Sequence, residues 1–167
     1  HTTYSTVENQ PLVYMSYAVR TPPDGQETYV KETMMDDRVH SDVLVGRWTP
    51  KKAKPEHNNT CWTYPVFTRD VMQYLLFATM MSVPNILGYH RHNSESIYYV
   101  DSGKGFVRVG GQESEAQAGD AVYIPDEVAH NCRSSLKEQP LNIFCVGVAV
   151  PYNAKVWTQE DLPDISV

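Results

Sequence analysis

The sequence is poor in basic residues, and its positive charges are scattered. It has 14 Lys and Arg against 20 Asp and Glu, which gives a formal net charge of −6 over 167 residues. Because no basic stripe is present that could follow a phosphate backbone, we expect no nucleic-acid partner. The one basic cluster, Lys51-Lys52-Ala53-Lys54, stands between two prolines and is interpreted as a solvated loop.

The chain also lacks long apolar runs and has few cysteines. No run reaches the length of a membrane-spanning helix, and the start lacks the charged-then-apolar pattern of a secretory signal. Because the sequence begins with His1 and not with Met, it is compatible with a targeting segment that has been removed. Three cysteines, an odd number without metal-type spacing, do not form a disulfide framework. We therefore expect a reduced, cytoplasmic protein without a membrane partner.

Short runs of β-branched, aromatic and apolar residues alternate with turn sequences such as Pro22-Pro23-Asp24-Gly25 and Gly110-Gly111. Many short strands at this spacing predict an all-β sandwich or barrel. The predicted strands are residues 12–19, 27–33, 43–49, 72–81, 86–92, 96–101, 105–109, 121–124 and 141–148. A short helix is predicted at residues 158–162.

The length and an ordinary apolar content of 41% suit one domain. The first sixty residues contain more Pro, Asn and charge than the rest, yet enough Tyr, Val and Trp to pack against a barrel. We expect a single domain (1–167) with an N-terminal extension of about residues 1–67, a barrel core of about 68–150 and a C-terminal tail of 151–167.

Three histidines are the most informative feature of the sequence. His90 and His92 follow an apolar run, and His130 lies 38 residues after His92. In an extended strand alternate side chains share a face, so His90 and His92 point the same way. Two imidazoles on one face, joined by a third from a neighbouring strand, predict a metal site.

The surrounding residues resemble the cupin superfamily. Its first motif reads G-x5-H-x-H-x3-4-E-x6-G, which His90, His92 and Gly103 match. Its second motif reads G-x5-P-x-G-x2-H-x3-N, which is matched by Gly119, Pro125 and His130. The match spans about residues 84–134. The resemblance implies a double-stranded β-helix (the cupin or jelly-roll barrel) with a metal ion at one end.

The sequence departs from these motifs at several positions. Pro84 and Glu127 stand where the family has glycine, and Ser134 stands where it has asparagine. Ser96 stands at the position of the usual carboxylate ligand, and Glu95 lies one residue earlier. Either Glu95 turns inward as a fourth ligand, or the site is three histidines with Ser96 in the vacated place. We favour the three-histidine site, because a one-residue slip would turn over the rest of the strand.

A three-histidine site leaves a divalent ion with its full charge and with open positions. Among cupins this arrangement resembles thiol dioxygenases and β-diketone-cleaving dioxygenases, in which Fe(II) binds an anionic or chelating substrate. The leading hypothesis is therefore a non-haem Fe(II) dioxygenase acting on a small anionic or chelating molecule. Zn, Mn, Ni or Cu also suit imidazole ligands. The resemblance also leads us to expect a homodimer.

Two other functions stay open. One is a redox-neutral lyase or isomerase in which Tyr98 or Glu95 acts as base. The other is a non-catalytic cupin that binds or senses a small ligand. Tyr98 is the first candidate for substrate orientation or proton transfer, whereas Tyr123, Cys132 and Arg108 are weaker candidates for the substrate pocket. His40 and His57 lie in polar, loop-like sequence, and we expect both to be exposed to solvent.

Overall fold

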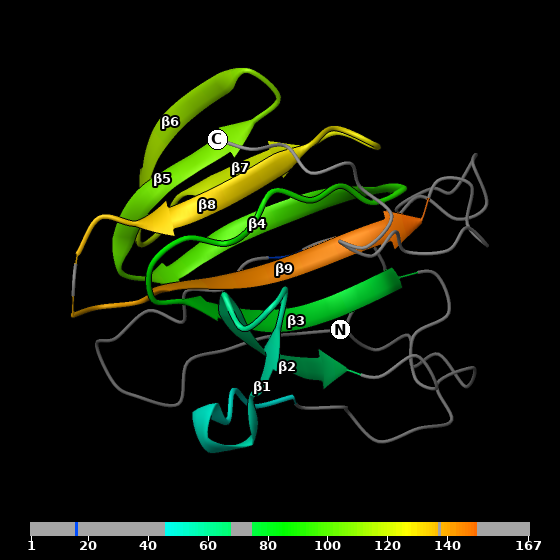
Figure 1. Cartoon of the computed structure of the whole chain (residues 1–167). Helices are drawn as coiled ribbons and strands as arrows, with labels where there is room; N and C mark the ends of the chain where they lie inside the picture. The colour runs from blue at the N-terminus through cyan, green and yellow to red at the C-terminus, as the bar shows by residue number, and fades with distance from the viewer. Residues whose placement is uncertain (1–15, 17–45, 68–74, 137, 150–167) are drawn as a thin grey trace, which may run out of the picture. The chain divides into compact units, whose positions relative to one another are not determined.

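The computed structural model describes Ser16 and residues 46–67, 75–136 and 138–149. All of these except Ser16 fall in the unit that begins at Gly46. Within it the described residues form nine strands and the short 3-10 helix η1 (Pro50–Lys52), arranged as two antiparallel sheets (Figure 1). The all-β prediction is confirmed. No helix in the described ranges is long and apolar enough to cross a membrane.

The two sheets differ in size. The larger has the order β1 (Lys54–Glu56), β2 (Cys61–Phe67), β3 (Leu75–Val83), β9 (Leu141–Ala149), β4 (Ser94–Ser102) and β7 (Ala121–Ile124). The smaller has the order β6 (Gln112–Gln117), β5 (Lys104–Val109) and β8 (His130–Ser134). β9 lies between β3 and β4, far from both in sequence, so the central pairings close only late along the chain.

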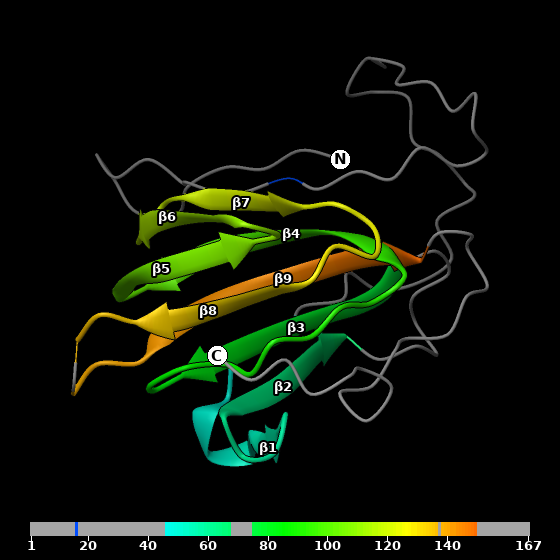
Figure 2. The ribbon, with the colours of Figure 1, turned by 45° about the horizontal axis from the view of Figure 1, so that its top comes forward.

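The hydrophobic core lies between the sheets, whose stacking is visible when Figures 1 and 2 are compared. Val107 from β5 and Cys132 from β8 belong to the same buried cluster as Val100 and Ile143 of the larger sheet. Each fully buried valine or isoleucine stabilises the fold by roughly 1.5–3 kcal/mol. Strand alternation places these residues on the inward faces of the sheets, because inward and outward side chains follow one another along each strand.

Several predicted strands are present with nearly the predicted bounds. β4, β5, β7 and β9 match the predictions for residues 96–101, 105–109, 121–124 and 141–148, and β3 covers the described part of 72–81. The prediction at 86–92 is wrong in detail. That segment is extended but irregular, with isolated bridges at Ile86 and His90 in place of a continuous strand.

Other predictions fall partly or wholly outside the described residues. The strands at 12–19 and 27–33 lie there, apart from the single residue Ser16, as does the helix at 158–162. In the prediction at 43–49, the described residues 46–49 form no strand. Their polar and glycine content gives no alternating face that a sheet could bury.

The sequence analysis missed four strands, β1, β2, β6 and β8. Pro65 lies within β2, and the register with β3 shifts between Pro65 and Phe67, a position at which a sheet tolerates proline. β6 exposes nearly every residue, so its sequence has no apolar alternation. It forms because the Gly110-Gly111 turn folds it back onto β5. β8 begins at His130, where the sequence is polar.

Glu127 adopts a backbone conformation that favours glycine. Its φ is 56°, and its backbone N–H donates a hydrogen bond of 3.0 Å to the carbonyl oxygen of His92. The turn therefore joins the segment before His130 to the segment that carries His92. A residue with a Cβ is strained in this left-handed region by about 1 kcal/mol.

We expect Glu127→Gly to stabilise the fold. Relief of the left-handed strain exceeds the entropy cost of glycine, so the free energy of unfolding should rise by about 0.5 kcal/mol. Denaturant unfolding measures it. The matched control is Glu138→Gly, at an exposed position without positive φ, where we expect a loss of about 0.5–1 kcal/mol. Equal destabilisation by both changes would contradict the strain at Glu127.

Candidate metal centre

His90 and His130 are joined directly by their backbones. The His90 N–H donates to the His130 carbonyl at 3.1 Å, and the His130 N–H donates to the His90 carbonyl at 2.9 Å. This reciprocal pair is an antiparallel bridge outside the regular ladders. Residues paired in this way place their side chains on the same face, and the two imidazole ring centroids lie 4.3 Å apart.

His92 joins this pair through strand alternation. Its ring centroid lies 4.8 Å from that of His130 and 5.8 Å from that of His90. The potential ligand nitrogens of the three residues all lie within 4.8 Å of one another. The side chains are 5%, 5% and 0% exposed for His90, His92 and His130. The three imidazoles therefore converge in the interior of the barrel.

Each of the three rings is oriented by a hydrogen bond at Nδ1. His90 Nδ1 donates to the Gly88 carbonyl oxygen at 3.0 Å, and His130 Nδ1 donates to the Val128 carbonyl oxygen at 2.8 Å. A carbonyl can only accept, so the proton of each neutral ring is on Nδ1 and the lone pair is on Nε2. Backbone carbonyls that accept from the other ring nitrogen commonly orient metal-bound histidines.

His92 is oriented by a serine instead of a carbonyl. Its Nδ1 lies 2.6 Å from Ser94 Oγ, which in turn lies 3.1 Å from Ser96 Oγ. Both hydroxyls are fully buried. Ser96 therefore acts on the imidazole cluster through Ser94 and His92. The sequence analysis did not single out Ser94, although its place two residues after His92 gave it the same phase.

The donor set fits a divalent ion. Nε2 of His92 is buried and has no hydrogen-bond partner among the described residues. A buried nitrogen without a partner is costly in the protein interior, and in the tautomer that donates from Nδ1 to Ser94 Oγ this nitrogen would be free to bind an ion. With Nδ1 of each ring engaged in a hydrogen bond, the three rings could hold a divalent metal through Nε2.

Burial keeps these histidines neutral. It lowers the pKa of both His92 and His130 to about 4, and it lowers that of His90 well below the usual range, with the nearby His130 and His57 contributing. Hydrogen bonds with the backbone oppose this lowering of the pKa, but desolvation is the larger effect. Neutral rings are the form that binds metal.

Ser96 and Glu95 point in opposite directions. β4 keeps its phase from Ser94 onward, so Ser96 is fully buried and Glu95 is exposed. The Glu95 carboxylate accepts a hydrogen bond of 2.8 Å from the hydroxyl of Tyr123 on β7. The shortened corner that would have brought Glu95 inward does not occur, so the three-histidine arrangement is the one that the geometry favours.

Tyr98 lies beside the cluster. It is 3% exposed, and its hydroxyl lies 3.1 Å from Nε2 of His130. Since that nitrogen carries the lone pair, the hydroxyl donates. Burial raises the pKa of Tyr98 well above its ordinary value, so the phenol stays protonated.

The three weaker pocket candidates lie elsewhere. Tyr123 is 52% exposed, because odd-numbered residues of β7 face outward opposite Ile97 of β4. Arg108 follows the inward-facing Val107, and its guanidinium lies 5.6 Å from the ring centroid of Tyr89. Cys132 is buried in the apolar core. These positions correct the expectation that the three side chains line the pocket.

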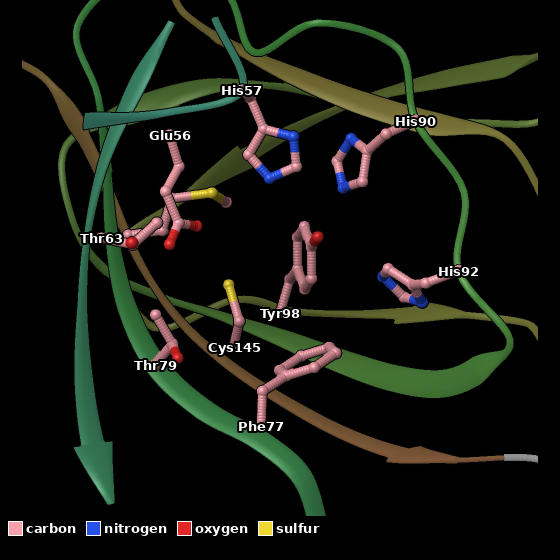
Figure 3. A pocket seen from close by; sticks show the side chains of 10 residues that line it. Glu56, His57, Thr63, Phe77, Thr79, His90, His92, Tyr98 and Cys145 are labelled. Atoms are coloured by element: carbon pink, nitrogen blue, oxygen red, sulfur yellow. The ribbon is translucent and has the colours of Figure 1, made fainter. Parts of the chain in front are cut away.

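A cavity of about 250 Å³ opens beside the imidazoles. Its lining combines His90, His92 and Tyr98 with His57 of the β1–β2 turn and with residues from β1, β2, β3 and β9, namely Glu56, Thr63, Phe77, Thr79, Met81 and Cys145 (Figure 3). The prediction that His57 is exposed is wrong, because its ring packs 4.5 Å from that of His90. No sequence signal marked it, since the pairing of β1 and β2 determines its position. His40 lies outside the described residues.

Comparisons with known proteins agree with this architecture. A family model described as a cupin domain matches residues 80–147, which contain all three histidines. This segment of the chain is thus similar to a cupin domain. The matched segment covers β4 to β8, the last four residues of β3 and most of β9, and the predicted double-stranded β-helix is confirmed.

Two solved structures are similar in fold. A Cupin 2 conserved barrel domain protein from Salinispora arenicola has a TM-score of 0.57 and 16% identity, over 67% of this chain and 93% of that one. The plu4264 protein from Photorhabdus luminescens has a TM-score of 0.53 and 13% identity, over 72% and 92%. At these identities the likeness concerns the fold alone.

A curated relative is similar in sequence. It is an uncharacterised protein from Methanocaldococcus jannaschii, 29% identical over 82 residues. The match takes in 49% of this chain and 65% of the relative. The chain thus spans somewhat less than two thirds of the relative's length.

We expect His90→Ala, His92→Ala and His130→Ala each to abolish stoichiometric metal loading, because each removes one of three neutral ligands. Glu95→Gln should retain the metal, because its carboxylate lies outside the barrel. Elemental analysis after dialysis against a divalent ion measures the loading. Full metal loading in any histidine variant would show that the substituted histidine is not a ligand. Complete loss of the metal in Glu95→Gln would contradict the three-histidine site.

The depressed pKa values predict how stability depends on pH. His92 and His130 have folded-state pKa values of about 4, below the unfolded value of about 6.5. Between these values the unfolded chain binds more protons, so the free energy of unfolding of the metal-free protein should fall as pH drops from about 6.5 to 4. Urea unfolding at several pH values measures this slope. The His92→Gln variant should have a shallower slope, and an unchanged slope would exclude a contribution from His92.

Proposed function

We propose that this cupin is a metal-dependent enzyme in which His90, His92 and His130 bind one divalent ion. The observation that carries the proposal is the orientation of the three rings. Their Nδ1 atoms are engaged by Gly88, Ser94 and Val128, and the buried Nε2 of His92 has no partner among the described residues.

Charge indicates the kind of ligand that such a site would take. Three neutral imidazoles do not compensate the positive charge of a divalent ion, and the Glu95 side chain faces away from the three histidines. The natural complement is a small anionic or chelating molecule. Bound Fe(II), the preferred ion, would supply the redox chemistry of a dioxygenase. Zn, Mn, Ni and Cu are compatible with the same ligands.

The chain's own residues would orient the ligand and exclude water from it. Tyr98 holds its proton toward His130 Nε2. When that nitrogen is occupied, the hydroxyl can donate instead to an anionic ligand in the cavity. Phe77 and Met81 supply apolar walls, which strengthen such polar contacts by keeping water out. Tyr98 is therefore proposed as a hydrogen-bond donor to the ligand.

The redox-neutral alternative is less well supported. It requires a base, and the two residues proposed for that role are poorly suited to it. Burial raises the pKa of Tyr98 well above its ordinary value, which disfavours the phenolate. The Glu95 carboxylate is exposed and accepts a hydrogen bond from the Tyr123 hydroxyl. A non-catalytic binding cupin would not need three buried, oriented imidazoles.

The experiment that separates these functions is oxygen uptake. Protein loaded anaerobically with Fe(II) is mixed with small thiol carboxylates and β-diketones, and oxygen consumption is followed by electrode. We expect uptake with at least one compound, and a fall of about tenfold or more in Tyr98→Phe, in line with loss of a donor to the reacting ligand. The zinc-loaded protein is the control.

Two results would redirect the assignment. Anaerobic turnover by the zinc or manganese form, without oxygen uptake by the iron form, would favour the lyase or isomerase. Failure to retain any metal near stoichiometry would favour a non-catalytic binding protein.

A further inference from the structure

The turn between β1 and β2 has an unusual backbone. His57, Asn58 and Asn59 have φ values of 50°, 55° and 62°, three consecutive non-glycine residues in the left-handed region. Each costs free energy in isolation, and such strain tends to persist where the position of a side chain matters. Thr60 closes the turn, because its N–H and its hydroxyl both donate to the His57 carbonyl, at 3.1 and 2.7 Å.

This turn is joined to the segment that carries a candidate metal ligand. The Gly88 N–H lies 3.4 Å from Thr60 Oγ1, and the Gly88 carbonyl accepts from His90 Nδ1. The rings of His57 and His90 lie 4.5 Å apart at an angle of 45°. A short chain of hydrogen bonds therefore connects the strained turn with the orientation of His90. The turn brings a fourth histidine to the cavity.

The cavity has two polar sides of different chemistry (Figure 3). His90 and His92 lie on one side, and Glu56, Thr63 and Thr79 lie on the other. His57 lies at one end between them, and its ring faces that of His90. The imidazole side suits an anionic group on an ion. The opposite side presents a carboxylate and hydroxyls, which suit a hydrogen-bond donor.

We propose that the β1–β2 turn forms the second half of the ligand site, with His57 over the ion-bound group and Glu56 receiving a hydroxyl or ammonium at the far end. The ligand class is a small bifunctional acid, with an anionic head for the ion and a donor at its other end. The inference rests on the proposed function, since it takes the ion at the three histidines as the anchor.

Charge and size both restrict this ligand. A second carboxylate at the far end would meet Glu56, which lines the cavity and is also exposed to solvent, and like charges repel. A purely apolar tail would leave Glu56 and Thr63 without a partner in the ligand. The cavity of about 250 Å³ is below the range of pockets for drug-sized molecules, so the ligand is a small metabolite.

The test uses four acids of similar length that differ in the far group: 4-aminobutyrate, 4-hydroxybutyrate, butyrate and succinate. Binding to the zinc-loaded protein is measured by calorimetry, because zinc separates binding from redox turnover. We expect 4-aminobutyrate and 4-hydroxybutyrate to bind about tenfold tighter than butyrate, the gain from one well-placed hydrogen bond. Succinate should bind most weakly.

Two variants assign the roles. Glu56→Gln should remove the advantage of 4-aminobutyrate over butyrate and reduce the penalty on succinate. Glu138→Gln, an exposed residue that does not line the cavity, is its charge-matched control and should leave the order unchanged. His57→Ala should weaken the binding of all four acids by a similar factor. His57→Asn keeps an N–H donor and tolerates the left-handed backbone, so it should restore part of the affinity. Asn58→Ala is the control within the turn.

The zinc content of every protein is measured first, so that two failures are distinguishable. Loss of zinc from the wild-type protein would overturn both the proposed function and this inference. Normal zinc loading with equal affinity for 4-aminobutyrate and succinate, or with an unchanged preference in Glu56→Gln, would overturn this inference alone.

Discussion

The reciprocal hydrogen bonds between His90 and His130 are the contact on which the candidate site depends. They join two stretches of chain 40 residues apart at a point outside the regular strands. Because the pair sets both Cβ atoms on one face, the two imidazoles meet without any side-chain rearrangement. The Glu127 N–H adds a further bond to the His92 carbonyl. The site is therefore positioned mainly by backbone geometry, and it is buried where side chains have few alternatives.

Burial and orientation act together at this site. The apolar surroundings keep the imidazoles neutral, and acceptors at Nδ1 direct the lone pairs inward. The same burial makes an unsatisfied nitrogen costly, which is the case for His92 Nε2. A cation resolves this cost, and its charge in turn requires an anion. The proposed ligand class follows from this sequence of requirements together with the carboxylate wall provided by Glu56.

The parts of the fold that sequence could predict are those in which burial alternates. β4 shows this well, since Ser94, Ser96, Tyr98 and Val100 all face inward as the strand period requires. That period also placed Glu95 outside the barrel. Strands without an apolar pattern escaped prediction, such as the exposed β6 and the proline-containing β2. The sequence also could not show which face of its strand Arg108 occupies, and only the pairing of β5 with its neighbours in the sheet decided this.

By itself, the sequence determined the fold class, the three histidines and their shared face, because strand alternation and motif spacing are local properties of the chain. Only the tertiary structure decided which other side chains meet those histidines. Ser94 reaches His92 through a shared strand face, whereas His57 reaches His90 through a strained turn and a hairpin docked far from it in sequence. The local sequence of a strand or a turn does not show which distant segment it will contact, because that contact is decided by packing in the folded chain.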